Sequence, residues 1–392
     1  MDIFDLALAM TPRVGNMTIE HLLGRFHSAE AIFAQSAEQL IQLGKINKAA
    51  AAAIASREGM ERAEAQISHC QQHNIAILCA NDPEYPTLLR SIHDAPYIIY
   101  VQGSVEALSR NLVSMVGTRR ISPYGDRACS QLVKQIAERI DRAAIVSGLA
   151  FGVDAAAHRA ALDNNIPTIA VVPTPLPNIT PAQHNSLAQR IIDSGGALVS
   201  EIRAGVSTRA NGFIARNRII AGLSQATIIV ESAIKGGSMA TAEIATSNNR
   251  TVCAVPGRIT DATSAGCNHL ISRRGVAAIT SADDLVHHLN WHDRLRESTH
   301  STHSTSVASV ASVASVASVA TVATPPTEPT RSDEETRVLR TLAESSSDTL
   351  HISELEQASG LDSATLGATL MTLELMGEVR MLPGAKYELL NR

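Results

Sequence analysis

The stretch LVSMVGTRRISPYG occupies residues 112–125, and the fold prediction depends on it. A run of apolar, partly β-branched residues ends at Gly117, and Arg119 and Arg120 follow at once. This is how a buried strand meets a phosphate-binding loop. The pattern is consistent with a nucleotide cofactor site, with a grip on a nucleic-acid backbone, or with a surface turn whose arginines pair with carboxylates.

Five further apolar runs are similar to the one at 112–116, and helical stretches separate them. The six runs cover residues 112–116, 143–147, 167–172, 197–202, 226–232 and 251–256. Short apolar strands that alternate with helices predict βαβ units, and therefore an α/β fold whose parallel sheet is covered on both faces. Ligands of such sheets bind outside the carboxyl ends of the strands, so the loops that follow strands are the candidate sites.

Other regions of the chain show other patterns. Residues 1–75 have apolar side chains at helical spacing and predict a helical domain, and residues 82–290 contain the alternating region. The polar segment 296–332, with its Val-Ala-Ser repeat and prolines, is typical of a low-complexity linker. Within the first region, LGKINKAAAAAI at 43–54 has the shape of a helix-hairpin-helix turn. Such turns bind duplex backbone in some proteins, and a purely structural helical domain is the other interpretation.

Residues 333–392 predict a winged-helix domain. Three helical patterns precede two strand-like runs, EVRML and AKYELL, which Pro383 and Gly384 join. A helix of this kind of domain usually reads the DNA major groove. The expected recognition helix, 363–376, contains no Lys or Arg, and the domain carries 11 acidic against 5 basic residues. A protein-contact or regulatory role is therefore as consistent with this domain as DNA binding.

The composition limits the classes of function. The 392-residue chain has a formal net charge of −5 and 3% aromatic residues, which argues against bulk electrostatic DNA binding and against a large base-stacking platform. Residues 107–290 nevertheless carry 18 Lys and Arg against 12 Asp and Glu. Five cysteines without CxxC spacing indicate a reducing cytoplasm. We expect neither a secretory signal nor a membrane span, because the N-terminus lacks a basic region and no apolar run reaches about 18 residues.

Two of the loops carry residues suited to phosphate. The first, 117–120, lacks the glycine spacing of a dinucleotide-binding loop or a P-loop, but Gly117 permits a close turn and Arg119 supplies a guanidinium. The second, KGGS at 235–238, follows another strand and opens a helix, so that amides, a helix dipole, a hydroxyl and a lysine gather there. Because both loops follow strands of one sheet, they predict a phosphate-lined pocket at one sheet edge.

The stretch FIARNRIIAGLS supplies two more arginines. Successive helical residues are rotated by about 100°, so Arg216 and Arg218 cannot face one ligand together. We expect one of them to face the site and the other to pair with a carboxylate such as Glu201 or Glu231. Asn217, between the two, is expected to hydrogen-bond backbone or phosphate.

The sequence shows no constellation typical of catalysis or metal binding. No Ser-His-Asp set, paired carboxylates or metal-ligand spacing stands out. We therefore expect no catalytic residue, no metal and no cofactor. His158 lies among alanines in a helical stretch, which favours a packed, hydrogen-bonded histidine over a catalytic one.

Five co-linear motifs resemble the DNA processing protein A (DprA/Smf) family: VGTRRISPYG, SGLAFGVDAAAH, RNRIIAGLS, the GGSMATA loop, and AVPG followed by GCNHLI and RRGVAAI. The resemblance covers about 82–285, and the N-terminal helices and winged helix are similar to those of longer members. It implies an extended Rossmann-like fold that binds single-stranded DNA with little sequence preference and has no established catalytic activity. It further implies a homodimer that protects incoming strands during natural transformation and loads the RecA recombinase.

The resemblance also implies site residues. The family's Gly-Ser/Thr-Arg loop, whose arginine contacts phosphate, falls on Gly117, Thr118 and Arg119, and its Ser-Gly-Ser helix start falls on 236–238. Together with the residues singled out above, the candidate DNA-binding residues are Gly117, Thr118, Arg119, Arg120, Arg216, Asn217, Lys235, Gly236, Gly237 and Ser238.

The chain departs from the family pattern at several positions. Ile214 replaces a proline before the RNR motif, and Gly236 replaces the first serine of Ser-Gly-Ser. In the element that is Tyr-Pro-Lys-x-Asn in the family, this chain has Thr180, Ala182 and His184. The lost lysine at Ala182 removes a phosphate contact that the family pattern would supply.

Two other functions are compatible with parts of the sequence. KGGSMATAE loosely resembles the PGGxGTxxE loop of nucleoside-monophosphate phosphoribohydrolases, in which Glu243 would be the acid residue. Lys235 and Ala240 depart from that motif. A mainly structural or protein-interaction role, with the acidic C-terminal domain as the contact, is the third hypothesis.

Overall fold

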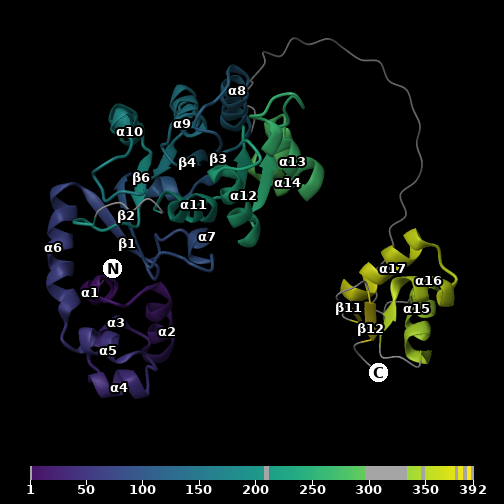
Figure 1. Cartoon of the computed structure of the whole chain (residues 1–392), viewed down its shortest axis with the longest axis horizontal. Coiled ribbons are helices and arrows are strands. Elements are labelled where there is room, and N and C mark those ends of the chain that lie inside the picture. Colours follow the sequence, from purple (N-terminus) through teal and green to yellow (C-terminus); the bar gives the residue numbers. More distant parts are fainter. Residues whose placement is uncertain are drawn as a thin grey trace, which may run out of the picture. The chain divides into compact units, whose positions relative to one another are not determined.

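The computed structural model describes residues 2–206, 212–295, 333–345, 349–375, 378–382 and 386–389 (Figure 1). The chain forms two compact units, Met1–Thr302 and His303–Arg392, and each is described by itself. The predicted linker at 296–332 and the predicted turn at Pro383 and Gly384 lie outside the described residues.

Six helices form the N-terminal part of the first unit. Four of them begin at a side chain that accepts an amide hydrogen of the first turn, namely Asp2, Ser28, Ser36 and Asn47, as helix starts require. Their apolar faces bury one shared cluster. The helices are α1 (Ile3–Met10), α2 (Asn16–Phe26), α3 (Ala29–Phe33), α4 (Ala37–Gln42), α5 (Lys48–Ala55) and α6 (Glu58–Gln72).

The helix-hairpin-helix turn between α4 and α5 has a structural reason for its glycine. A Cβ at Gly44 would lie 2.4 Å from the carbonyl oxygen of Leu40. The same glycine accepts a hydrogen bond from His21 Nε2 at 2.9 Å through its carbonyl oxygen. Packing within the helical domain therefore accounts for Gly44, and DNA binding by this turn stays a prediction.

The core of the first unit is a nine-stranded sheet in the order β1-β2-β6-β5-β4-β3-β7-β8-β9. All six predicted strands are present, as β3 to β8, and they pair in parallel. Two strands outside the predicted set, β1 and β2, pair antiparallel at one edge, so the sheet is mixed. The strands are β1 (Ile75–Cys79), β2 (Ile98–Gly103), β3 (Asn111–Val116), β4 (Ala143–Ser147), β5 (Thr168–Val171), β6 (Ala197–Ser200), β7 (Ala226–Ile229), β8 (Thr251–Ala254) and β9 (Ala277–Ala278).

Helices cover both faces of this sheet, because its strands are apolar on both sides (Figure 1). Val113 and Met115 of β3 pack against α8, α9 and α14, and α10 lies against α9. The alternate residues Leu112 and Val116 pack on the other face, with α7, α11, α12 and α13. The helices are α7 (Thr87–Arg90), α8 (Pro123–Arg139), α9 (Val153–Asp163), α10 (Asn185–Asp193), α11 (Gly212–Leu223), α12 (Gly237–Ser247), α13 (Ala265–Arg274) and α14 (Ala282–Leu289), with short 3₁₀ turns η1 (Glu106–Ser109), η2 (Ala182–His184) and η3 (His292–Arg294).

The strand order reverses between β3 and β7. From β3 the chain adds β4, β5 and β6 in one direction, and α11 then returns it to the opposite side of β3, where β7 begins. The loops that leave the carboxyl ends of β3 and β7 therefore diverge. A crevice forms at such a switch point, and ligands of open α/β sheets bind there.

The N-terminal helices contact the antiparallel edge of the sheet. Asp5 of α1 accepts a hydrogen bond from the Tyr97 hydroxyl at 2.6 Å, and His69 Nε2 of α6 donates to the carbonyl oxygen of Leu176 at 2.9 Å. Their side chains share one apolar cluster with β1 and β2. The N-terminal helices thus pack at the β1–β2 edge of the sheet, and β6, β5 and β4 separate this edge from the switch point between β3 and β7.

The second unit has the predicted order of three helices and a hairpin. Its core contains Val338, Leu355, Leu370 and Tyr387. A small sheet has the order β10-β12-β11. The elements are α15 (Asp333–Glu344), β10 (Leu350–His351), α16 (Ile352–Ser359), α17 (Ser363–Leu375), β11 (Val379–Leu382) and β12 (Lys386–Leu389).

Two further observations concern the described residues. All five cysteines are buried and unpaired. In the described parts of the chain, no helix is both long enough and apolar enough to cross a membrane.

His158 of α9 is packed in the core, as predicted. The side chain is fully buried, and its Nδ1 lies 2.7 Å from the Thr168 hydroxyl. That hydroxyl donates to the carbonyl oxygen of Ile145, so Nδ1 carries a hydrogen and donates to Thr168. Burial, together with the smaller effects of the nearby His184 and Arg216, lowers the pKa of His158 to about 3. The imidazole is therefore neutral at neutral pH.

We expect His158 to make the first unit sensitive to acid. Below pH 6.5 the unfolded chain protonates this histidine, whereas the folded chain does so only near its depressed pKa of about 3. Folding stability therefore falls as the pH drops below 6.5, by about 3 kcal/mol at pH 4.5. Urea unfolding of the wild type and His158→Asn at pH 7.5 and pH 4.5 measures this difference. Equal losses in the two proteins would contradict it.

Candidate functional site

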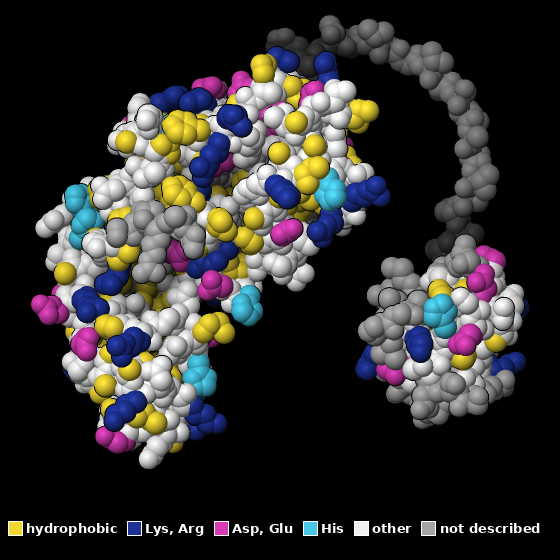
Figure 2. All heavy atoms as spheres, in the orientation of Figure 1, with side chains coloured by type: hydrophobic (Ala, Val, Ile, Leu, Met, Phe, Trp, Pro, Cys, Tyr) yellow, Lys and Arg dark blue, Asp and Glu magenta, His cyan; other side chains and the backbone are white. Residues whose placement is uncertain are grey.

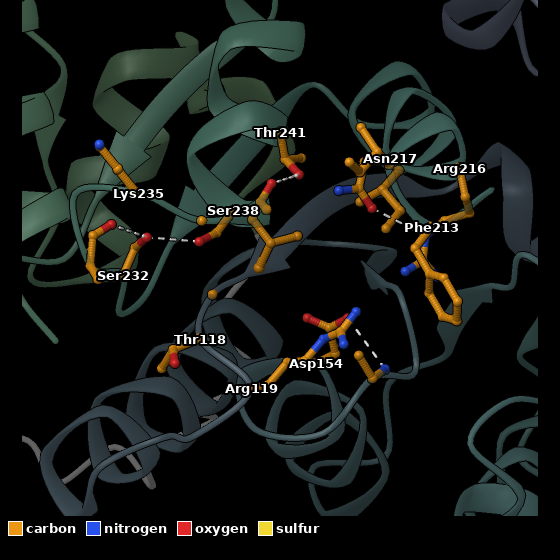
Figure 3. A pocket seen from close by; sticks show the side chains of 18 residues that line it. Thr118, Arg119, Asp154, Phe213, Arg216, Asn217, Ser232, Lys235, Ser238 and Thr241 are labelled. Atoms are coloured by element: carbon orange, nitrogen blue, oxygen red, sulfur yellow. Dashed lines mark hydrogen bonds between the residues drawn. The ribbon is translucent and has the colours of Figure 1, made fainter. Parts of the chain in front are cut away.

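An open cavity of about 300 Å³ lies at the switch point between β3 and β7 (Figure 3). Its walls come from the loop after β3, from α11, and from the loop after β7 with the start of α12. Nine of the ten candidate residues line it, namely Gly117, Thr118, Arg119, Arg216, Asn217, Lys235, Gly236, Gly237 and Ser238. The predicted meeting of the two phosphate loops at one sheet edge is therefore seen in the structure.

Arg120 is the candidate residue that lies outside this cavity. Its side chain is exposed and lines a neighbouring cavity, which Arg119 also borders. The backbone N–H of Arg120 donates to the Thr118 hydroxyl at 3.2 Å, which turns the chain at this point. Arg119 thus borders both cavities, whereas Arg120 borders the second one.

Glu231, at the end of the β7 strand region, holds both ends of the loop after β3. Its carbonyl oxygen accepts the N–H of Thr118 at 2.7 Å, and its carboxylate accepts the N–H of Ser122 at 2.8 Å. Ser122 is the N-cap of α8, so the same carboxylate lies at the positive end of a helix. Glu231 is 1% exposed, and water does not compete for these bonds.

Two glycines let the loop after β3 pack closely against the loop before α9. A Cβ at Gly117 would lie 2.4 Å from Val153 Cγ2. Gly152 has φ +77°, and a Cβ there would lie 2.2 Å from the carbonyl oxygen of Thr118. The same carbonyl oxygen accepts the N–H of Val153 at 3.1 Å. These contacts fix the backbone from which Arg119 projects.

The two arginines of α11 separate as predicted. Arg218 forms a two-pronged ion pair with Glu201, with both Nη–Oε distances at 2.7 Å, and its Nε donates to Asp94 at 3.0 Å. Arg216 instead lines the cavity, where it is 5% exposed. Its Nη1 donates to the carbonyl oxygens of Gly148 and Val171 at the ends of β4 and β5.

Arg216 and Asp154 place a buried pair of charges beneath the cavity. Burial lowers the pKa of Arg216 to about 10, and the negative charge of Asp154 opposes that shift. Burial also raises the pKa of Asp154, and Arg216 opposes this in turn. A Cβ at Gly148 would lie 2.6 Å from both Arg216 Nη2 and Asp154 Oδ2, so this glycine provides the space for the pair. Arg216 remains charged at neutral pH.

The polar side chains of Asn217 and Ser238 already form hydrogen bonds within the protein. Asn217 Oδ1 accepts from Arg216 Nε at 3.2 Å, which orients the amide and leaves its NH₂ group as a donor. Ser232 donates to the carbonyl oxygen of Ala233 at 2.8 Å, so the Ser238 hydroxyl, 2.8 Å from Ser232 Oγ, donates to Ser232. The hydrogen of Ser238 therefore points away from a ligand. Its role is to shape the start of α12.

Arg119 and Lys235 are the exposed cations of the cavity. They come from opposite loops, and across the described parts of the chain neither has a carboxylate within 4 Å (Figure 3). Lys235 directly precedes the first turn of α12, whose leading amides add a partial positive charge. Figure 2 shows Lys and Arg side chains bordering the hollowed part of this face. The cavity is therefore suited to an anion.

Phe213 is a cavity residue that the sequence reasoning did not select. Its ring lies 5.5 Å from the guanidinium carbon of Arg119, close enough for a cation–π contact, and it is half-buried. Ile214, next to it, also lines the cavity and is 57% exposed. The position of Phe213 just before the RNR motif is the feature of the sequence that could have identified it. An aromatic face thus lies beside the anion site.

The cavity does not contain the residues expected of a nucleotide hydrolase. Glu243, the acid residue of the phosphoribohydrolase hypothesis, is absent from its lining. Its side chain is 73% exposed and lies 3.9 Å from Arg274. Among the described residues, no cluster of three metal-ligating side chains is present.

The fold and site define a doubly wound α/β protein with a crevice at its switch point that is suited to an anion. Residues 76–290 match the family described as DNA recombination-mediator protein A, and residues 322–385 match the DprA winged helix domain. The first match covers more than half of the chain, and the chain belongs to this DprA/Smf family.

Individual relatives are similar over more than half of this chain. Protein Smf of Escherichia coli K12 is 36% identical over 228 residues, which are 58% of this chain and 60% of that protein. DNA processing protein DprA of Streptococcus pneumoniae R6 is 38% identical over 205 residues, 52% of this chain and 71% of that protein. The chain thus spans less than two thirds of the E. coli relative. The X-ray structure of DprA from S. pneumoniae has a TM-score of 0.62 at 30% identity, over 73% of this chain and 98% of that one.

We predict that Glu231→Ala loosens the loop after β3. The variant leaves the partly buried N–H of Ser122 without its acceptor, which costs about 1 kcal/mol or more of folding stability. Hydrogen exchange of the segment 117–122 should accelerate, and urea unfolding measures the loss. Glu231→Gln keeps an acceptor oxygen and should lose less. Equal protection of this segment in Glu231→Ala and the wild type would contradict the anchoring role.

Proposed function

We propose that this protein binds single-stranded DNA at the switch-point cavity and acts as a DNA recombination mediator. The observation that carries the proposal is that Arg119, Lys235 and the start of α12 all line one open cavity. Three sources of positive charge at one site suit the phosphate of a nucleic-acid backbone. Family membership supports the same conclusion.

The shape of the cavity favours a single strand over a duplex. A volume of about 300 Å³ suits a phosphate with its sugar rather than a double helix. Phe213 presents an aromatic face beside the cations, and only an unstacked base has a free face to lie against it. The site offers no array of side chains that would read base edges, so we propose binding with little sequence preference.

The finer role rests on the family resemblance. We propose that the protein acts as a cytoplasmic homodimer, protects incoming single strands during natural transformation and loads RecA recombinase on them. The proposed site has no catalytic, metal or cofactor role. The ten candidate residues, Arg120 included, are proposed as DNA contacts or as their immediate supports, with Arg216 and Ser238 acting through the shape and charge of the cavity floor.

We predict that Arg119→Ala and Lys235→Ala each weaken binding of oligo-dT on the order of 10- to 100-fold, the value of a charge-assisted contact. Because these contacts go to phosphate, the loss should be the same for oligo-dT and for mixed sequences. The slope of log affinity against log salt should also fall by about 0.7 for each variant. Fluorescence anisotropy at several salt concentrations measures both quantities.

The matched control is Lys134→Ala. Lys134 is 63% exposed on α8, lies outside the cavity and pairs with Glu138 at 3.8 Å. Its removal changes the net charge of the protein as Lys235→Ala does, and it should leave affinity nearly unchanged. If Arg119→Ala bound as tightly as the wild type, the loop after β3 would not be part of the DNA site.

A phosphoribohydrolase activity is the alternative, and we predict its absence. Incubation with AMP should release no adenine above a no-protein control, because the Glu243 carboxylate is exposed and lies outside the cavity. Chromatography of the reaction detects adenine directly. Adenine release that Glu243→Gln abolishes would establish the enzyme instead.

A further inference from the structure

The loop between β4 and α9 ends in an exposed aromatic side chain. Phe151 is 46% exposed, although most phenylalanines are buried and the chain has five of them. It belongs to the SGLAFGVD motif, and the cavity at the switch point does not use it. Its exposure therefore needs an explanation other than the packing of the core.

The ring of Phe151 is held in place from behind. It lies edge-on against the ring of His184, with 4.8 Å between centroids and 62° between planes. His184 is 5% exposed, and its Nδ1–H donates to the carbonyl oxygen of Leu149 at 2.7 Å. Leu149 at φ +55° and Gly152 at φ +77° fix the turn that projects Phe151 outward. An exposed ring with a rigid support loses little entropy when a second aromatic group stacks on it.

Phe151 borders a second cavity, of about 310 Å³. Three arginines line it, Arg119, Arg120 and Arg159, against the single carboxylate of Asp126. Its floor is made of small side chains from the first turn of α9. Arg119 also lines the cavity at the switch point, so the two cavities adjoin across this residue.

The positive charge of this second cavity comes from side chains. Amides at the start of α9 are already engaged, since those of Val153, Ala155 and Ala156 donate to carbonyl oxygens of Thr118, Ala150 and Gly152. The arginines and the exposed ring are therefore the groups available to a ligand. Cations beside an aromatic face are the combination that binds the backbone and a base of single-stranded nucleic acid.

We propose that a single strand held at the switch-point cavity continues across Arg119 and stacks its next base on Phe151, with the following phosphate between Arg120 and Arg159. This inference rests on the proposed function and extends its site. It gives Arg120 a role separate from that of its neighbour. It also assigns a use to His184, which stands in the Tyr-Pro-Lys-x-Asn element where the lysine position is Ala182. The chain offers a stacking contact near the place where that lysine is missing.

The experiment compares Phe151→Ala, Phe151→Leu and Phe151→Trp in the full chain. Because Phe151 is on the surface, all three should keep the wild-type circular dichroism and melting temperature. Loss of one stacked base should weaken oligo-dT binding about 5- to 100-fold in Phe151→Ala, and Phe151→Trp should restore it. Phe151→Leu keeps an apolar surface without a π-face, and wild-type affinity for this variant would overturn stacking.

A modified strand locates the stacked base. An oligo-dT that carries one 2-aminopurine, moved along the strand, should show at one position a quenching that Phe151→Ala abolishes, distinct from the quenching of a base against Phe213. With an abasic residue at that position, wild type and Phe151→Ala should bind equally. A persistent difference between them on the abasic strand would overturn the proposal.

Two variants separate failure of this inference from failure of the proposed function. If Arg119→Ala weakens binding and Phe151→Ala does not, the strand leaves the first cavity by another path and the inference is wrong. If neither variant weakens binding, the proposed function is wrong as well. Met17→Ala, which removes another exposed apolar side chain from α2, should leave affinity unchanged.

Discussion

The contact between Glu231 and the loop after β3 is the constraint on which the site depends. Glu231, which follows β7, accepts the amide hydrogens of Thr118 and Ser122. Because β3 and β7 are neighbours in the sheet, the two loops that leave them have to diverge around this point. The opening between them becomes the cavity, and Arg119 projects into it from a backbone held on both sides. In a surface turn without these hydrogen bonds, the backbone would not fix the direction of Arg119.

The charges of the site are divided by depth. Arg216 is buried, bonded to carbonyl oxygens at the ends of two strands and balanced by Asp154, so it shapes the floor. Arg119 and Lys235 are exposed and come from opposite sides. A buried charge without a partner would cost several kcal/mol. The buried guanidinium of Arg216 is therefore accompanied by the carboxylate of Asp154. Arg119 and Lys235, the cations available to a ligand, lie at the surface, where water solvates them until a ligand binds.

Much of this organisation follows from local sequence signals. The six strands of the parallel region and the separation of Arg216 from Arg218 were predictable, because strand burial and the 100° helical step act within a few residues. The antiparallel strands β1 and β2 were not predicted, since they join the sheet only through the pairing of β2 with β6 and of β1 with β2. Phe213 was also missed, because its value depends on Arg119, which lies far away in the chain.

The sequence by itself determined the βαβ order, the two glycine-containing loops after β3 and β7, the packed state of His158 and the family. These properties depend on residue types at short spacing. Tertiary structure alone decided that Arg218 is the arginine that pairs with Glu201 and that Arg120, unlike Arg119, lies outside the cavity at the switch point. The reason is physical: helical geometry gives the angle between two side chains, but the positions of distant carboxylates and strand ends decide which one faces the crevice.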